Sequence, residues 1–329
     1  MLKIGNLKLD SPLILAPMAG ISDLPYRMIN RSMGCGFAFT EMLSATALAY
    51  GNKGTMSKLT RIKEDRPLAV QIVGQNTDLI KQALETLSEY PYDTIDLNAA
   101  CPVKKVAGTG KGAGLLKDPL KLQGILKVIV ESTEVPVTVK IRSGWDDTSI
   151  NAVEVALHAQ DAGVSAVIIH GRTRSQRYSG TVNYDIIREV KEAIDVPLIA
   201  SGDALRPELI KKMFDETGCD GVIIARGALG NPWIFRQTEE YLKKGTEPSP
   251  PDIQERMRVM TEHLASMIEC NGKRLGLIQF RKFYGWYTKG LPAKALKVKA
   301  FRTSTHEEMQ EMIDRLRECE RIEAGEERS

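Results

Sequence analysis

A cysteine and an asparagine stand three residues apart in the segment Asp96-Leu97-Asn98-Ala99-Ala100-Cys101-Pro102. The thiol follows a short apolar run, and Lys104 and Lys105 come soon after it. Neighbouring cations favour the thiolate form when they lie close to the sulfur in space. We therefore expect Cys101 to be a reactive thiol, with a small apolar filler as the alternative for a cysteine in such a place.

A lysine inside an apolar run is the second candidate for chemistry. Lys140 stands among Val137, Val139 and Ile141, where an ammonium group is costly to bury unless an anionic group receives it. It could form a Schiff base, as in barrel aldolases, or lie beside a flavin ring and stabilise the negative charge of the reduced cofactor. His170 ends another apolar run, and because Arg172 follows it, we expect this histidine to contact a ligand.

Two glycine-containing segments, Ser201-Gly202-Asp203 and Ala225-Arg226-Gly227, follow the last two apolar runs of the first 230 residues. Glycine allows a close approach of the backbone to a ligand, and a guanidinium group is suited to phosphate. In barrels the loops after strands seven and eight commonly bind phosphate. The two segments therefore predict a phosphorylated ligand, with ordinary turns as the alternative.

These residues must be positioned by the elements around them. Eight short apolar runs are separated by segments with apolar residues at helical spacing, and this pattern predicts a (β/α)8 TIM barrel. Catalytic and binding residues then belong at the carboxyl ends of the strands. A doubly wound sheet is the alternative, but no glycine-rich phosphate loop follows the first run. The predicted strands are 13–16, 37–41, 68–73, 94–97, 137–141, 166–170, 198–200 and 221–225, and the helices include 78–89, 119–132, 151–162, 184–193 and 207–216.

The chain changes character near Lys243-Lys244-Gly245, where a segment containing proline and glycine follows the last barrel helix. We predict a catalytic barrel over residues 1–245 and a small all-helical domain over 246–329, with helices at 252–270, 275–289 and 305–323 and a frayed end at 326–329. Residues 273–306 contain nine basic side chains and no acidic one, interleaved with six aromatic residues. Such a stretch is typical of a nucleic-acid surface, with a buried aromatic stripe as the alternative.

Composition limits the class of protein. The 329 residues are 43% hydrophobic and 26% charged, which indicates a globular chain with a sizeable core. The net charge of +3 does not by itself demand a nucleic-acid partner. The other four cysteines form no metal-ligand pattern with the four histidines, and no segment is long and apolar enough to span a membrane. We expect a cytoplasmic monomer with reduced thiols and no metal.

Taken together, the motifs resemble those of the tRNA-dihydrouridine synthases, and most closely the bacterial-type branch of that family. The resemblance extends over nearly the whole chain. It rests on Ala16-Pro17-Met18-Ala19-Gly20 with Asp23, Gln71, Asn98-x-x-Cys101-Pro102, Val139-Lys140-Ile141-Arg142, His170-Gly171-Arg172-Thr173, Ser201-Gly202-Asp203, and Arg226 before Pro232-Trp233. Three positions depart from the usual pattern: Ala100, Ser201 and Ala225 stand where the family more often has Gly, Asn and Gly.

The resemblance implies an FMN-binding barrel that reduces uridines in tRNA to 5,6-dihydrouridine, with NADPH or NADH as the reductant. It implies that Cys101 gives a proton to uracil C5 while the reduced flavin delivers hydride to C6. Asn98 and Arg142 would bind the substrate, and Arg172, Arg174, Arg177, Lys104 and Lys105 could guide its phosphates. The residues implied to bind FMN are Pro17, Met18, Ala19, Gln71, Lys140, His170, Ser201, Gly202, Asp203, Ala225 and Arg226.

Three other functions remain open from the residues alone. A small-molecule FMN reductase of the dihydroorotate dehydrogenase type would share the barrel and the cysteine, but it leaves the basic tail without a role. A Schiff-base aldolase would use Lys140 but not Cys101 or Gln71. A non-catalytic RNA-binding protein would use the barrel only as a scaffold.

Overall fold

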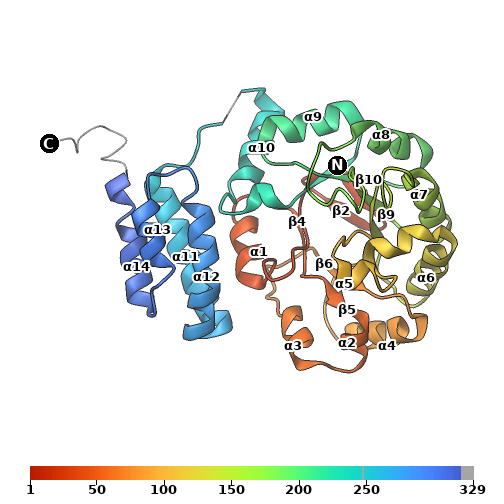
Figure 1. Cartoon of the computed structure of the whole chain (residues 1–329), viewed down its shortest axis with the longest axis horizontal. Coiled ribbons are helices and arrows are strands. Elements are labelled where there is room, and N and C mark those ends of the chain that lie inside the picture. The colour runs from red at the N-terminus through yellow and green to blue at the C-terminus, as the bar shows by residue number, and fades with distance from the viewer. Residues whose placement is uncertain (247, 320–329) are drawn as a thin grey trace.

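Eight parallel strands close into a barrel in the computed structural model, which describes residues 1–246 and 248–319 (Figure 1). The order of the sheet is β4-β3-β11-β10-β9-β8-β7-β6, and a second pairing between β4 and β6 closes it, with Phe39 opposite Ala69. The TIM-barrel prediction is therefore confirmed. The barrel strands are β3 (Leu13–Leu15), β4 (Phe37–Phe39), β6 (Leu68–Val73), β7 (Thr94–Asn98), β8 (Val137–Arg142), β9 (Ala166–His170), β10 (Leu198–Ser201) and β11 (Gly221–Ile224).

Helices surround the barrel and cover the outer face of the sheet (Figure 1). Asn76, Asp118 and Asn183 each accept a backbone N–H at the first turn of the helix they precede, which fixes where that helix begins. The helices of the barrel are α1 (Leu24–Arg31), α2 (Ala45–Ala49), α3 (Lys53–Met56), α4 (Thr77–Ser88), α5 (Lys104–Ala107), α6 (Pro119–Glu131), α7 (Ala152–Asp161), α8 (Tyr184–Ala193), α9 (Pro207–Thr217) and α10 (Ile234–Lys244), with 3-10 turns η1 (Ser57–Leu59), η2 (Gly112–Lys117) and η3 (Arg226–Ala228).

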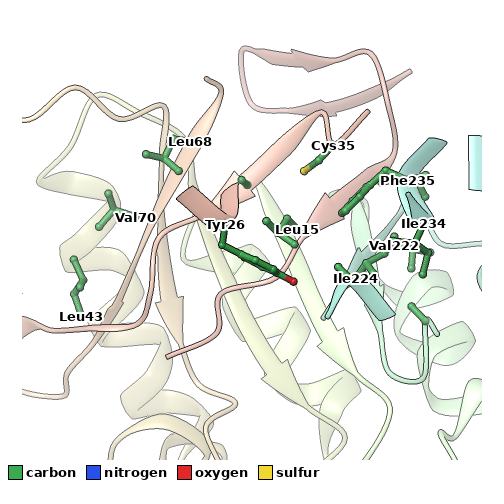
Figure 2. Packing of buried hydrophobic residues seen from close by; sticks show 14 of the residues in the cluster. Leu15, Tyr26, Cys35, Leu43, Leu68, Val70, Val222, Ile224, Ile234 and Phe235 are labelled. Carbon is green, nitrogen blue, oxygen red and sulfur yellow. The ribbon is translucent and has the colours of Figure 1, made fainter. Parts of the chain in front are cut away.

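Alternate residues of each strand belong to two different cores, because successive side chains point to opposite faces of a sheet. Leu15, Val222 and Ile224 lie on the outer face, and Figure 2 shows them among the side chains that pack toward Ile234 and Phe235 of α10. Their neighbours Ile14 and Ile223 fill the interior. The two faces together explain why these strands read as continuous apolar runs.

Three short strands were absent from the sequence prediction. β1 (Leu2–Ile4) and β2 (Leu7–Leu9) form an antiparallel hairpin whose leucine and isoleucine side chains join the apolar interior of the barrel. Leu2 approaches Gly221 at the amino end of β11, so the hairpin caps the barrel end opposite the strand carboxyl ends. The third, β5 (Leu43–Ser44), pairs with the end of β6.

After α10, the described residues form a C-terminal helical bundle beside the barrel, which contains α11 (Ile253–Asn271), α12 (Lys273–Tyr287), α13 (Lys294–Ala300) and α14 (His306–Asp314) (Figure 1). The sequence prediction missed α13. In the predicted helix 305–323, α14 ends at Asp314 and residues 317–319 are again helical. Residues 320–323 and the predicted frayed end at 326–329 lie outside the described residues. Within the described residues, no helix is both long and apolar enough to cross a membrane.

The bundle packs tightly on the barrel. The ring of Tyr26 in α1 lies 5.5 Å from that of Phe283 in α12 and 6.3 Å from that of His263 in α11, between ring centroids. Gly230, in the loop before α10, has a positive φ of 65°, and a Cβ there would collide with the backbone of Trp286 and Tyr287. One continuous cluster of buried apolar side chains therefore extends from the barrel helices into the bundle.

Candidate active site

A cavity of about 470 Å³ opens at the carboxyl ends of the barrel strands. Polar side chains from six strand ends reach it, since the residues that end parallel strands meet at one edge of a barrel. The sequence-predicted residues that line the cavity are Pro17, Met18, Ala19, Gln71, Asn98, Cys101, Lys140, Arg142, His170, Ser201, Gly202, Asp203, Ala225 and Arg226. The structure thus brings together every residue predicted to contact the cofactor, the predicted acid, and two of the residues predicted to bind substrate.

Five of the residues predicted to bind substrate do not line the cavity. Lys104 and Lys105 lie exposed on α5, and Arg177 is exposed in the loop after β9 with a φ of 53°. Arg174 places its guanidinium 4.3 Å from the ring centroid of Trp145. The fifth, Arg172, is buried. The other four are also absent from the lining of the cavity.

Buried arginines tie the loops of the site together. Arg142 donates from Nε to the Ala100 carbonyl at 2.8 Å and from Nη1 to the carbonyls of Thr173 and Arg177 at 2.9 and 3.0 Å. It therefore connects the loop after β7, which carries the cysteine, to the loop after β9. Burial lowers the pKa of Arg142 to about 10, so the guanidinium stays charged at neutral pH.

Arg172 plays a similar part on the other side of the cavity. Its guanidinium donates to both carboxylate oxygens of Asp203 and to the backbone carbonyls of Ser179 and Gly180. These bonds use donors on all three guanidinium nitrogens. We therefore assign Arg172 to holding the loops after β9 and β10, where the sequence reasoning expected a contact with substrate phosphates.

The backbone around Cys101 is held by Asn98. The Oδ1 atom of Asn98 accepts the N–H groups of Ala100 and Cys101 at 3.1 and 2.8 Å, and its Nδ2 atom donates to Gln71 Oε1 at 2.8 Å. The Cys101 carbonyl accepts the N–H of Ala113 at 3.1 Å. Gly112, at a φ of 54°, passes so close that a Cβ there would lie 3.0 Å from the Cys101 Cβ. The cysteine is half-buried, and its position is set from two sides.

Lys140 and His170 give the cavity wall its electrostatic character. Burial, reinforced by Arg142 and opposed by Asp96, lowers the pKa of Lys140 to about 8. Burial lowers the pKa of His170 far more, and Arg142 and Lys140 add to the effect, so the imidazole is neutral at physiological pH. The His170 Nε2 atom is buried with no hydrogen-bond partner among the described residues. A ligand with a polar edge would satisfy it.

The far end of the cavity is cationic. Asp203 forms salt bridges with both Arg172 and Arg226, so one carboxylate lies between two guanidinium groups. Gly202 has a φ of 124°, and a Cβ there would press against Val182 and His170, so only glycine fits at this position. Arg226 is 44% exposed in its side chain and lines the cavity, so part of its guanidinium is accessible besides its contact with Asp203. These features suit a phosphate group.

Two residues of the site were missed by the sequence reasoning. Tyr178 lines the cavity and is 58% exposed, with its ring 5.1 Å from the Arg226 guanidinium and 5.9 Å from that of Arg142. It follows His170 in the same strand-to-helix loop, which was a signal for it. Asp96 is fully buried below the cavity, and its carboxylate accepts hydrogen bonds from the side chains of Gln71 and Thr138. Its place two residues before Asn98, on the same strand face, was the available signal.

The aromatic residues of the basic stretch belong mostly to the core. Phe280, Phe283, Tyr284 and Tyr287 are buried, and Phe301 is exposed. The basic side chains remain largely at the surface, since Arg281, Lys282 and Lys297 are partly buried and the other six are exposed. The interpretation of a buried aromatic stripe therefore holds for four of the six aromatic residues.

Lys282 also connects the bundle to the cavity wall. Its ammonium donates to the carbonyl of Gly20, whose N–H in turn donates to the Glu41 carboxylate. Lys58 pairs with the same carboxylate at 2.9 Å. Gly20 directly follows the cavity-lining residues Pro17, Met18 and Ala19, so the bundle fastens one wall of the cavity.

No cluster of side chains suited to a metal ion is found in the described parts of the chain. The fold and the site therefore define a (β/α)8-barrel protein with a pocket at the carboxyl ends of its strands that combines apolar and cationic side chains, and with a half-buried thiol in the pocket wall.

Comparison with known proteins gives the family. Residues 14–322 match the family model described as dihydrouridine synthase, and the chain belongs to that family. A relative named "Probable tRNA-dihydrouridine synthase" from Rickettsia conorii is 39% identical over 296 residues, which cover 90% of this chain and 89% of the relative. Another, named "tRNA-dihydrouridine synthase B" from Pseudomonas aeruginosa, is 38% identical over 290 residues, which cover 88% of this chain and 87% of the relative.

Solved structures share the barrel at low sequence identity. A 2-naphthoyl-CoA reductase complex superposes with a TM-score of 0.58 at 12% identity, over 73% of this chain and 51% of that chain. Histamine dehydrogenase from Rhizobium sp. 4-9 superposes with a TM-score of 0.58 at 11% identity, over 80% of this chain and 50% of that chain. At these identities the likeness concerns the fold.

Proposed function

We propose that the chain is an FMN-dependent tRNA-dihydrouridine synthase, which reduces uridines of tRNA to 5,6-dihydrouridine. The observation that carries the proposal is the position of Cys101 in the wall of a pocket that also holds Asn98, Gln71 and Lys140. Membership of the dihydrouridine synthase family and the names of the relatives support the same reaction. We further propose that NADPH or NADH is the reductant and that the protein acts as a cytoplasmic monomer.

The side chains of the pocket fit a flavin mononucleotide. A ring with hydrogen-bonding edges would satisfy the buried Nε2 atom of His170, and the Lys140 ammonium in the pocket lining could donate to the same edges. Gln71 retains one N–H and one carbonyl lone pair after its bonds to Asp96 and Asn98. Arg226, with the backbone from Ser201 to Asp203 and at Ala225, would hold the phosphate. Bound and reduced, this cofactor supplies hydride for C6 of the uracil ring.

The protein's own contribution is to orient the base and to supply a proton. Cys101 gives its thiol proton to C5 of the ring, so that two hydrogen atoms are added across one double bond. Asn98 has one N–H left for the base, because its Nδ2 atom already donates to Gln71, and its oxygen already accepts two backbone N–H groups. Arg142, held by three carbonyls, keeps the cysteine loop fixed during this transfer. The uridine must leave the base stack to enter the pocket.

We propose that the chain divides into the catalytic barrel, residues 1–245, and a tRNA-binding helical domain, residues 246–329. Exposed basic residues on α12 and α13, and in the segments that flank α13, support this assignment: Lys273, Arg274, Lys289, Lys294, Lys299 and Arg302. Around the pocket, Arg174, Arg177, Lys104 and Lys105 would meet nearby phosphates. Contacts of this kind make binding strongly dependent on salt concentration.

The decisive experiment is nucleoside mass spectrometry of dihydrouridine-free tRNA after incubation with the protein, FMN and NADPH. We expect a gain of two hydrogens on uridine, and a rate at least about 100-fold lower for Cys101→Ala, in line with the usual contribution of a general acid. The variant should still bind flavin and tRNA. Flavin binding with turnover of a free orotate-like substrate instead of tRNA would overturn the proposal in favour of a small-molecule reductase. Failure to bind flavin would overturn the assignment of the pocket.

A further inference from the structure

A buried carboxylate lies beneath the pocket and takes no part in the proposed chemistry. Asp96 is in β7 and has no exposed surface. It is the strand neighbour of Gln71 in β6 and of Thr138 in β8, so the three side chains form one layer across the barrel interior. Its two oxygens accept the Thr138 hydroxyl at 2.6 Å and Gln71 Nε2 at 2.7 Å.

From Asp96 a row of hydrogen bonds leads to the reactive cysteine. Gln71 Oε1 accepts from Asn98 Nδ2 at 2.8 Å, and Asn98 Oδ1 accepts the backbone N–H groups of Ala100 and Cys101. A primary amide has a donor end and an acceptor end, and its neighbours decide which end points where. Here a carboxylate, which is ionised at neutral pH and then only accepts, stands at one end of the row. Backbone N–H groups, which only donate, stand at the other.

We propose that Asp96 is a positioning residue for the cysteine: it sets the direction of the hydrogen bonds through Gln71 and Asn98 and so holds the Ala100–Cys101 backbone in place at the pocket wall. Only one orientation of the two amides satisfies both ends of the row. Reversing the Gln71 amide would direct its oxygen at the Asp96 carboxylate and its NH2 group at the Asn98 NH2 group. Burial makes both mismatches costly.

The role of the cysteine rests on the proposed function, but the hydrogen-bond row can be tested without it. The measurement is hydrogen exchange of the Ala100 and Cys101 amides in the purified full-length protein, resolved to single residues. The amide of Ile186, which donates to Asn183 Oδ1 at 3.1 Å at the start of α8, is the internal reference, because general destabilisation would accelerate it too.

Four variants separate the effect of hydrogen-bond direction from that of the Asp96 charge. Asp96→Leu removes the acceptor, and Gln71→Glu places two carboxylates face to face. In both variants we expect hydrogen exchange at Ala100 and Cys101 to be about ten-fold faster relative to Ile186, which is the effect of losing about one hydrogen bond. Asp96→Asn keeps an acceptor oxygen for Gln71, so we expect a change of less than about three-fold. In Asp96→Asn combined with Gln71→Glu, the new amide can donate to the new carboxylate, which still accepts from Asn98, and we expect a return toward the wild-type rate.

Two results would overturn the proposal. One is equal acceleration in Asp96→Asn and Asp96→Leu, which would mean that the charge matters and the direction does not. The other is a double variant that exchanges as fast as Gln71→Glu alone, a comparison that holds even if Asp96→Leu does not fold. In the tRNA assay, we expect Asp96→Leu to lower kcat and leave tRNA affinity unchanged. Absence of tRNA reduction in the wild type would refute the proposed function and leave the exchange result standing.

Discussion

The imidazole of His263 is packed where the helical bundle meets the barrel, and this makes the stability of the protein depend on pH. The side chain has no exposed surface and lies among Tyr26, Phe280, Phe283 and Tyr287. Its Nδ1 atom lies 3.1 Å from the Tyr287 hydroxyl, and its Nε2 atom has no partner within the described residues. Burial, with a smaller contribution from Lys282, lowers its pKa from 6.5 to about 3.

The sign of the effect follows from proton binding. The folded protein keeps His263 neutral, whereas the unfolded chain takes up a proton once the pH falls below about 6.5. Stability is therefore fully present above pH 6.5 and is lost as the pH falls toward 3. At pH 5 the loss is about 1.5 pH units times about 1.4 kcal/mol, or roughly 2 kcal/mol.

His263→Phe keeps an aromatic ring in the cluster and removes the titration. We would measure urea unfolding of both proteins at pH 7.5 and at pH 5.0 by tryptophan fluorescence. The wild type should lose about 2 kcal/mol more than the variant between the two pH values. Asp23 and Asp96, whose pKa values burial raises to about 6, act in the opposite direction but are common to both proteins. The reasoning would be refuted if the difference in unfolding free energy between the wild type and His263→Phe were the same at pH 7.5 and at pH 5.0, within about 0.5 kcal/mol.

Two glycine pairs provide further predictions, each with a control of the same backbone conformation. Gly112→Ala should lower tRNA reduction much more than Gly110→Ala, because both have positive φ but only the first directs its Cβ at Cys101, whereas the second meets the movable Gln75 side chain. Equal activities in the two variants would show that Gly112 does not position the cysteine. Gly230→Ala should cost at least about 3 kcal/mol of unfolding free energy and Gly245→Ala about 1 kcal/mol, since a Cβ at position 245 meets nothing within 4 Å. Similar midpoints in urea would mean that the bundle does not press on Gly230.

Much of the site was predictable from the sequence because a barrel gathers its chemistry at one edge. Gln71, Lys140 and His170 stand at or near the ends of apolar runs, and β6, β9 and α8 were predicted with the bounds that the structure has. The hairpin β1–β2 was missed because three-residue strands carry too little pattern to stand out.

Other features depended on contacts that no local pattern contains. The buried role of Arg172 follows from the conformation of the loop at Ser179 and Gly180, and that of Asp96 from the register of three strands. The aromatic residues of α12 were partly predictable, since positions 280, 283, 284 and 287 recur at helical spacing and mark a core-facing stripe.

The contact between Lys282 and Gly20 joins the helical bundle to the pocket wall, and the ring contacts of Tyr26 with Phe283 and His263 pack the bundle against the barrel. Under the proposed function, the bundle binds one part of the tRNA. The pocket then receives the nucleotide that lies at the matching distance and angle from the bound part. The choice of uridine is thereby separated from the chemistry performed on it. A change in the orientation of the bundle relative to the barrel would bring a different nucleotide of the tRNA to the same unaltered pocket.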